Sequence, residues 1–221
     1  MQNENIRITR IQKTKKDRFA LFCGEEFLFS VDAETFFTRH LEEGMTFAPW
    51  ELEGLRAASE TRKAADKALQ YLSLRDHASG ELYKKLCQRF DEHSAAAAVA
   101  KAASLGLLDD EAFARRRAKA LLQRSKSRRE IARHLAEKGV ARDTIDAVLE
   151  ELYEPEEPDP DAPDPETAAA LALLRKSYAR KLAEGRRENV LAALARRGFS
   201  YSAAREAMDL YQEEQAGGEE E

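Results

Sequence analysis

The 221-residue sequence is poor in cysteine, glycine and proline, and it contains no long apolar run. Its two cysteines, Cys23 and Cys87, exclude a disulfide framework and are typical of the reducing cytoplasm, where we expect the protein. No window holds the roughly 18 consecutive apolar residues of a membrane span, and polar residues 1–10 lack the core of a signal peptide. Alanine, leucine, glutamate, lysine and arginine dominate, which favours helices.

The sequence also lacks the motifs of the common enzyme classes. It has no glycine-rich phosphate loop, zinc-protease helix, paired-cysteine metal pattern or serine elbow. Adjacent Asp109 and Asp110 point in different directions on a helix, and a helix cap explains them better than a catalytic carboxylate pair. The four histidines share no metal-ligand spacing: His40, His77, His93 and His134. We expect no enzyme activity and no catalytic, cofactor or metal site.

Residues 1–50 differ from the rest of the chain, because β-forming residues dominate 6–11, 19–22 and 27–31. Turn-forming residues separate these runs, and Asp32 is a suitable N-cap for a short helix. We expect a small antiparallel sheet with one helix, separable from the remainder.

From residue 51 the apolar period becomes helical, and segments 81–86, 130–140 and 189–199 align as an internal repeat. Each contains an apolar pair four residues apart and lies between two further helical patterns. Gly139 and Gly198, each followed by an apolar residue, are typical helix C-caps. The prediction is a mainly all-α fold of three tandem three-helix repeats in an elongated array, with a small N-terminal α+β region. The expected repeats are residues 51–108, 109–153 and 166–214.

Negative charge is concentrated in two segments, a proline-rich linker at 154–165, where prolines exclude a helix and like charges extend the chain, and a tail at 215–221, which we expect to be disordered. The net charge of −5 therefore conceals basic repeats. Residues 62–153 hold 19 basic and 14 acidic residues, a balance of +5, and 167–212 hold 9 and 4, also +5. A polyanionic partner is compatible with this pattern.

The densest basic stretch runs from residue 115 to 142, with eleven arginines and lysines against two glutamates. A solvated face of charge-rich helices is the alternative explanation, but many of these residues lack an acidic residue at i±4. The third repeat continues the pattern more weakly. The candidate binding residues are Arg115, Arg116, Arg117, Lys119, Arg124, Lys126, Arg128, Arg129, Arg133, Arg186, Arg187, Arg196 and Arg197.

Three stretches resemble the signatures of the RecX regulatory proteins. They are Leu69-x-x-Leu72-Ser73-x-Arg75-x-x-x-Ser79-x-Glu81-Leu82-x-x-x-Leu86, Leu105-Gly106-Leu107-Leu108-Asp109-Asp110-Glu111-Ala112-Phe113-Ala114 and Glu130-Ile131-x-x-x-Leu135-x-x-Lys138-Gly139-Val140. The resemblance covers about residues 62–214 and implies three tandem three-helix repeats. The linker at 154–165, and Phe90 in place of a helix-ending glycine, depart from the pattern.

The resemblance implies a bacterial modulator that binds in the groove of the RecA–DNA filament and limits strand exchange and ATP hydrolysis. It also implies weak direct binding to single- and double-stranded DNA. We expect a monomer without a membrane partner, and we expect signature residues Leu69, Leu72, Leu82 and Leu86 to lie in the core. Two alternatives stay open: a general DNA-binding helical-repeat protein, for example a repressor built on helix-turn-helix units, and a scaffold that binds only protein.

Overall fold

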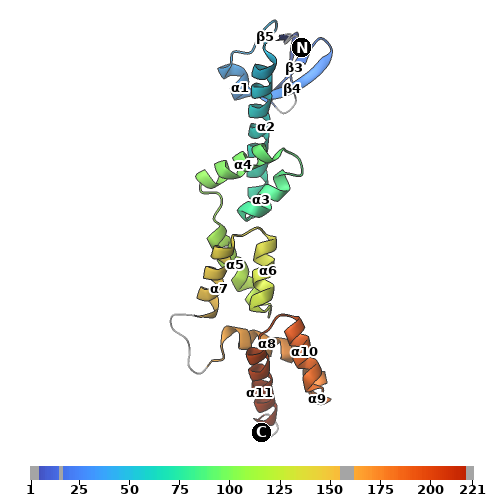
Figure 1. Cartoon of the computed structure of the whole chain (residues 1–221), viewed down its shortest axis with the longest axis vertical. Helices are drawn as coiled ribbons and strands as arrows, with labels where there is room; N and C mark the ends of the chain where they lie inside the picture. The colour runs from blue at the N-terminus through green and yellow to red at the C-terminus, as the bar shows by residue number, and fades with distance from the viewer. Residues whose placement is uncertain (1–4, 15–16, 155–161, 218–221) are drawn as a thin grey trace. The chain divides into compact units, whose positions relative to one another are not determined.

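The computed structural model describes residues 5–14, 17–154 and 162–217, and most of the predicted linker and the last residues of the predicted tail lie outside these ranges. The chain divides into two compact units (Figure 1). The first comprises residues 1–76 and 82–108, and the second comprises 77–81 and 109–221.

The first unit begins with the predicted antiparallel sheet. Its three strands, β2 (Arg10–Lys13), β3 (Arg18–Cys23) and β4 (Glu26–Asp32), pair in the order β2-β3-β4, and β1 (Ile6–Arg7) pairs separately with β5 (Thr46–Phe47). Gly24, with a φ of +61°, forms the turn between β3 and β4. One face of the sheet buries Leu21, Phe29 and Val31 against Leu52 of the helix that follows.

Two helices cover this face. The short helix α1 (Ala33–Thr38) begins at Asp32, whose carboxylate accepts a hydrogen bond from the Thr35 amide at 2.9 Å. The long helix α2 (Pro49–Leu72) starts with proline in its first turn, where the missing N–H costs nothing. Leu52, near its start, is buried in the sheet core, whereas Ala64 and Ala68, further along, belong to the core of the first repeat.

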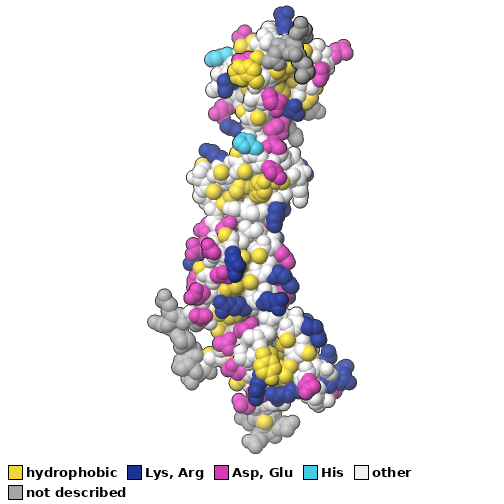
Figure 2. Space-filling view, viewed as in Figure 1, with side chains coloured by type: hydrophobic (Ala, Val, Ile, Leu, Met, Phe, Trp, Pro, Cys, Tyr) yellow, Lys and Arg dark blue, Asp and Glu magenta, His cyan; other side chains and the backbone are white. Residues whose placement is uncertain are grey.

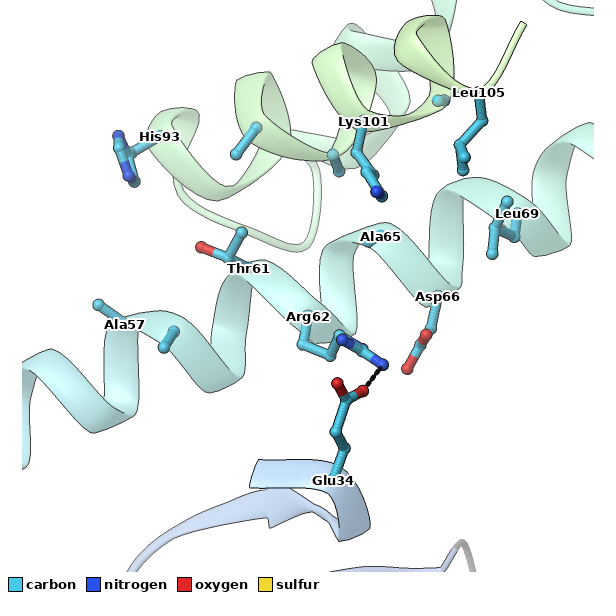
Figure 3. Close-up of a pocket in the computed structure, with 14 residues that line it drawn as sticks. Glu34, Ala57, Thr61, Arg62, Ala65, Asp66, Leu69, His93, Lys101 and Leu105 are labelled. Atoms are coloured by element: carbon cyan, nitrogen blue, oxygen red, sulfur yellow. Dashed lines mark hydrogen bonds and ion pairs between the residues drawn. The ribbon is translucent and has the colours of Figure 1, made fainter. Parts of the chain in front are cut away.

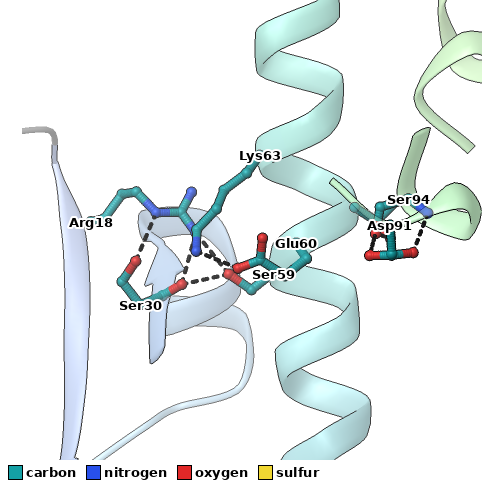
Figure 4. A network of polar contacts seen from close by, with 8 residues as sticks. Arg18, Ser30, Ser59, Glu60, Lys63, Asp91 and Ser94 are labelled. Carbon is teal, nitrogen blue, oxygen red and sulfur yellow. Dashed lines mark hydrogen bonds and ion pairs between the residues drawn. The ribbon is translucent and has the colours of Figure 1, made fainter. Parts of the chain in front are cut away.

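A polar network fixes α2 to the sheet (Figure 4). The Arg18 guanidinium donates to the Ser30 carbonyl at 2.8 Å and to the Ser59 hydroxyl at 2.7 Å, and Ser59 is fully buried on α2. Burial lowers the pKa of Arg18, although the nearby carboxylates of Asp32 and Asp66 oppose this effect. Because one continuous helix enters both cores, residues 1–50 are not the separable region expected from the sequence but part of one unit with the first repeat.

The first repeat consists of α2, α3 (Ser79–Leu86) and α4 (Glu92–Ser104). Leu82 and Leu86 are fully buried and Leu72 packs at the edge of this core, as predicted. Leu69 was predicted to be buried as well, but 45% of its surface is exposed. It lies with Leu105 at one end of a groove of about 780 Å³ between α2 and α4 (Figure 3).

The second repeat contains α5 (Asp110–Leu122), α6 (Arg128–Glu137) and α7 (Arg142–Tyr153). Asp109 caps α5 by accepting from the Ala112 amide at 2.8 Å, which confirms its interpretation as a helix cap. Ile131 and Leu135, the apolar pair of this repeat, are fully buried. Gly139 ends α6 with a φ of +77°, as the repeat pattern predicts.

The third repeat contains one helix more than predicted. Its elements are α8 (Pro165–Ser177), α9 (Ala179–Ala183), α10 (Arg187–Arg196) and α11 (Tyr201–Gly217). The expected first helix breaks at Tyr178, where the backbone leaves the helical conformation (φ −125°) and α9 follows as a separate short helix.

Both boundaries of the third repeat also shift. Asp164 caps α8, so the helix includes Pro165, which suits the first turn. Residues 215–217 are helical rather than tail, because no proline or glycine interrupts the pattern before Gly217. Among the residues described, no helix is long and apolar enough to cross a membrane.

The first turn of α3 belongs to the second unit and contacts the end of α6. Gly80 and Gly139 approach so closely that a Cβ on either would lie 2.7 Å or less from the backbone of the other, so both positions require glycine. Beside them Glu81 accepts hydrogen bonds from Lys138 at 2.7 Å and interacts with the Nδ1 of buried His77 at 3.0 Å.

Candidate basic interface in the second unit

The predicted basic residues do not form one surface but divide among several. Five of the thirteen line one groove between α6 and α10: Lys126, Arg129, Arg133, Arg196 and Arg197. Three lie together on α5: Arg115, Arg116 and Lys119. The other five lie outside both surfaces: Arg117, Arg124, Arg128, Arg186 and Arg187.

The groove between α6 and α10, here called the basic groove, has a volume of about 990 Å³. Its floor is apolar and includes Ala132, Val140 and Ile145. Arg142, at the start of α7, joins the five predicted cations along its walls. Figure 2 shows Lys and Arg side chains gathered over the part of this unit formed by α6 and α10. Six cations face two carboxylates, those of Glu130 and Asp146, across the groove.

The walls of the groove are held together by contacts between the second and third repeats. Ser127 caps α6 by accepting from the Glu130 amide, and its hydroxyl donates to the Arg197 carbonyl at 2.7 Å. Gly198 follows with a φ of +87°, and a Cβ there would lie 3.0 Å from the Ser127 hydroxyl and from Arg129 Cβ. Leu122 packs against both repeat cores. The groove is therefore part of the packed structure of this unit.

Half of the groove cations pair with a carboxylate four residues further along the chain. Lys126 pairs with Glu130 at 2.5 Å, and Arg133 lies 3.8 Å from Glu137. Arg142 pairs with Asp146 at 3.6 Å on α7. These i,i+4 pairs offset more of the positive charge of the basic stretch than we predict from the sequence.

Arg129, Arg196 and Arg197 form the unneutralised half of the groove. Within residues 5–14, 17–154 and 162–217 none of the three has an ion-pair or side-chain hydrogen-bond partner, and all three are exposed. Three guanidinium groups without counter-charges repel one another, and a bound polyanion would relieve that repulsion. These three residues carry the positive charge of the groove that no described carboxylate offsets.

The α5 cations form a second, shallower surface against α7. Arg115 donates to Glu151 at 2.8 Å and pairs with Glu111 at 2.6 Å, and the hydrogen bond to Glu151 raises the pKa of Arg115. Lys119 is exposed beside Arg116 and the apolar Leu152. Because Arg115 is already paired with two carboxylates, this surface is less cationic than its sequence indicates.

Arg117 does not belong to an outward surface, contrary to the sequence prediction. Its half-buried guanidinium donates from Nε to the Nε2 of His134 at 2.9 Å, joining α5 to α6. Burial lowers the pKa of His134, and the positive charges of Arg117 and Lys138 lower it further. The neutral imidazole accepts this hydrogen bond, so Arg117 and His134 act in packing the repeat.

The remaining candidates lie at separate places. Arg124 is exposed in the turn after α5, and Arg128 lies 5.5 Å over the ring of Tyr153. Arg186 pairs with Glu184 at 3.2 Å, and Arg187 with Asp209 of α11. None of these four lines the basic groove.

Arg142 was counted in the basic stretch but not selected as a candidate. Its signal in the sequence was its place at the start of the next helical pattern, three residues after the helix-ending Gly139. No group of three or more His, Cys, Asp or Glu residues able to hold a metal occurs in the described part of the chain.

Two family models match the chain, "Regulatory protein RecX N-terminal domain" over residues 6–47 and "RecX, second three-helix domain" over residues 109–149. A "Regulatory protein RecX" from Caldanaerobacter subterraneus subsp. tengcongensis is 32% identical over 148 residues, 66% of this chain and 75% of that protein. Another from Listeria welshimeri is 28% identical over 201 residues, 89% of this chain and 72% of that protein.

Two crystal structures share the fold. One of "regulatory protein RecX" is 23% identical with a TM-score of 0.66, covering 92% of this chain and 98% of its own. RecX from Lactobacillus salivarius is 20% identical with a TM-score of 0.57, covering 69% and 96%. Tandem three-helix units place the protein in the helical-repeat class. Together with the sequence relatives, they show that the chain belongs to the RecX family of regulatory proteins.

Proposed function

We propose that the protein binds the RecA–DNA filament through its basic groove and inhibits strand exchange and ATP hydrolysis by the recombinase. The observation that carries this proposal is the convergence of Arg129, Arg196 and Arg197, without counter-charges among the described residues, on one groove built by two repeats. The RecX relatives support a regulatory role.

The chemistry of the groove suits a partner that offers both phosphate and protein. Guanidinium groups bind phosphates and carboxylates in a bidentate manner, and release of condensed counterions makes phosphate binding favourable and salt-dependent. The apolar floor at Ala132, Val140 and Ile145 adds contact area that a bare phosphate backbone does not fill. A filament presents DNA phosphates beside protein side chains, and it therefore fits both features.

A strand-exchange assay with purified RecA tests this function. Full-length protein, added in substoichiometric amounts to preformed filaments, should inhibit both strand exchange and DNA-dependent ATP hydrolysis. Binding measured in parallel on filaments and on naked DNA should be tighter on filaments at the same salt concentration. Normal strand exchange in the presence of saturating protein would contradict the proposal.

A general DNA-binding protein is the second candidate, because the α5 surface adds a separate patch of cations near Lys119. Such a protein would bind naked duplex as tightly as the filament and would lose affinity for both with the same dependence on salt. A scaffold that binds only protein would show little salt dependence and no DNA binding without RecA.

A further inference from the structure

A cation and two aromatic rings form a row across the sheet of the first unit. The strand register places Arg10 of β2 opposite Phe22 of β3, and Phe22 opposite Phe27 of β4. Arg10 and Phe22 adjoin the core residues Ile11 and Leu21 along their strands, so their side chains point to the opposite face. The row therefore lies on the face opposite the Leu21 core, at the end of the sheet next to the β3–β4 turn, whereas α2 contacts the other end of this face through Arg18 and Ser59.

The three groups contact one another in turn. The Arg10 guanidinium lies over the Phe22 ring, 4.1 Å from its centre, and the rings of Phe22 and Phe27 meet edge to face, 5.7 Å apart at 66°. Phe27 is 56% exposed, an unusual surface for an aromatic residue in a strand. The exposed ring offers a flat surface on which a planar ligand can stack, with a cation close beside it.

The charges around the row favour an anionic ligand on the β2 side. Arg10 is exposed and has no acidic partner in the parts of the chain that the structure describes. Two carboxylates near this face are already engaged: Glu43 accepts from the Ile11 amide at 2.8 Å, and Asp32 caps α1 through Thr35. Glu25 in the β3–β4 turn and Glu26 at the start of β4 lie on the Phe27 side, so a phosphate would bind on the side of Arg10.

We propose that this row is a binding site for single-stranded nucleic acid, with one base stacking on Phe27 and a neighbouring phosphate or base held by Arg10. Stacking on aromatic side chains next to a cation is the usual basis of sequence-tolerant single-strand binding. The site belongs to the first unit, whereas the basic groove belongs to the second, and it requires no recombinase.

Fluorescence anisotropy of a labelled thymidine oligonucleotide with the full chain, without RecA, tests the site. Phe27→Ala should weaken binding by about five-fold or more, the lower end expected for loss of one base-stacking contact. Phe27→Trp should bind at least as tightly as the parent. Phe37→Ala is the matched control, because Phe37 is also exposed, at 65%, but contacts Phe19 and Phe36 beside α1.

An abasic oligonucleotide of the same length separates stacking from charge. Its affinity should be equal for the parent and for Phe27→Ala, whereas Arg10→Gln should weaken both probes and reduce the salt dependence of binding. Equal affinities of Phe27→Ala and Phe37→Ala for the thymidine probe would overturn the proposal. So would an equal loss on the abasic probe, or a Phe27→Ala variant that loses only filament binding, since the row would then contact protein.

Discussion

The hydroxyl of Ser127 donates a hydrogen bond to the carbonyl oxygen of Arg197 at 2.7 Å, across 70 residues of sequence. Ser127 is fully buried, and the same hydroxyl caps α6. One side chain thus starts the helix that carries Arg129 and fixes the turn that carries Arg197. The geometry of the basic groove depends on this contact between repeats.

Replacing Ser127 with alanine should destabilise the protein by about 1–3 kcal/mol, because the α6 cap is lost and the Arg197 carbonyl loses the hydrogen bond from the buried Ser127 hydroxyl. Urea unfolding followed by circular dichroism measures this change. Ser202→Ala, at an exposed position, is the control. Equal midpoints for the two variants would contradict the assigned role of Ser127.

Gly198→Ala should be more damaging than Gly185→Ala, although both glycines have a positive φ, +87° and +72°. Each substitution forces a side chain into the left-handed region, which costs about 1–2 kcal/mol. Only at Gly198 does the new methyl group also press on Ser127 and Arg129, at 3.0 Å. Thermal unfolding should therefore show a lower Tm for Gly198→Ala. A Tm equal to that of Gly185→Ala would show that the two repeats separate readily at this point.

Deletion of residues 1–50 should loosen the first repeat and leave the second unit folded. The deletion removes the sheet against which Leu52 packs and the Arg18 side chain that bonds to Ser59. Hydrogen exchange should show lost protection in α2 and unchanged protection in α5–α7. Full protection of α2 in the truncated chain would mean that the repeat folds without the sheet.

Stability should fall as the pH drops below about 6.5, the ordinary pKa of histidine, through His134. The folded pKa of His134 is lowered by burial and by Arg117, so the unfolded chain binds this proton more readily. The stability that neutral His134 contributes is therefore present above pH 6.5, and it is lost as the pH falls through the pKa of His134 in the folded protein. His134→Gln should reduce the slope of unfolding free energy between pH 7.5 and 5, and His93→Gln, at an exposed position, should not. Identical slopes for the parent and His134→Gln would argue against this account.

Much of the fold is predictable because its determinants are local. The apolar pairs Leu82/Leu86, Ile131/Leu135 and Val190/Leu194 are all fully buried, and Gly139 and Gly198 end their helices with positive φ. The continuity of α2 was not predictable in the same way. The apolar period of α2 predicts a helix, but it does not predict that Leu52 packs on the sheet. A local sequence pattern does not identify packing partners that are distant in the sequence.

The site was less predictable than the fold. Charge density drew attention to the second repeat, but it did not distinguish half-buried Arg117, bonded to His134, from exposed Arg129. Charge density also did not predict that Arg129 lies near Arg197, because the packing of the second repeat against the third brings them together. The pairing of Arg115 with Glu151 likewise depends on the contact of α5 with α7.

The most direct test of the account compares two triple variants in RecA-dependent strand exchange. One changes the groove residues Arg129, Arg196 and Arg197 to glutamate. The control changes Lys119, Arg124 and Arg205, exposed cations outside the groove, and alters the net charge equally.

The groove variant should need about ten-fold or more protein for half-inhibition and should lose roughly one unit of salt slope per phosphate contact. The control should remain within about two-fold of the parent, since cations outside the contact surface contribute only a screened long-range field. Inhibition by the groove variant at the parent's concentration would contradict the central claim that this groove binds the filament.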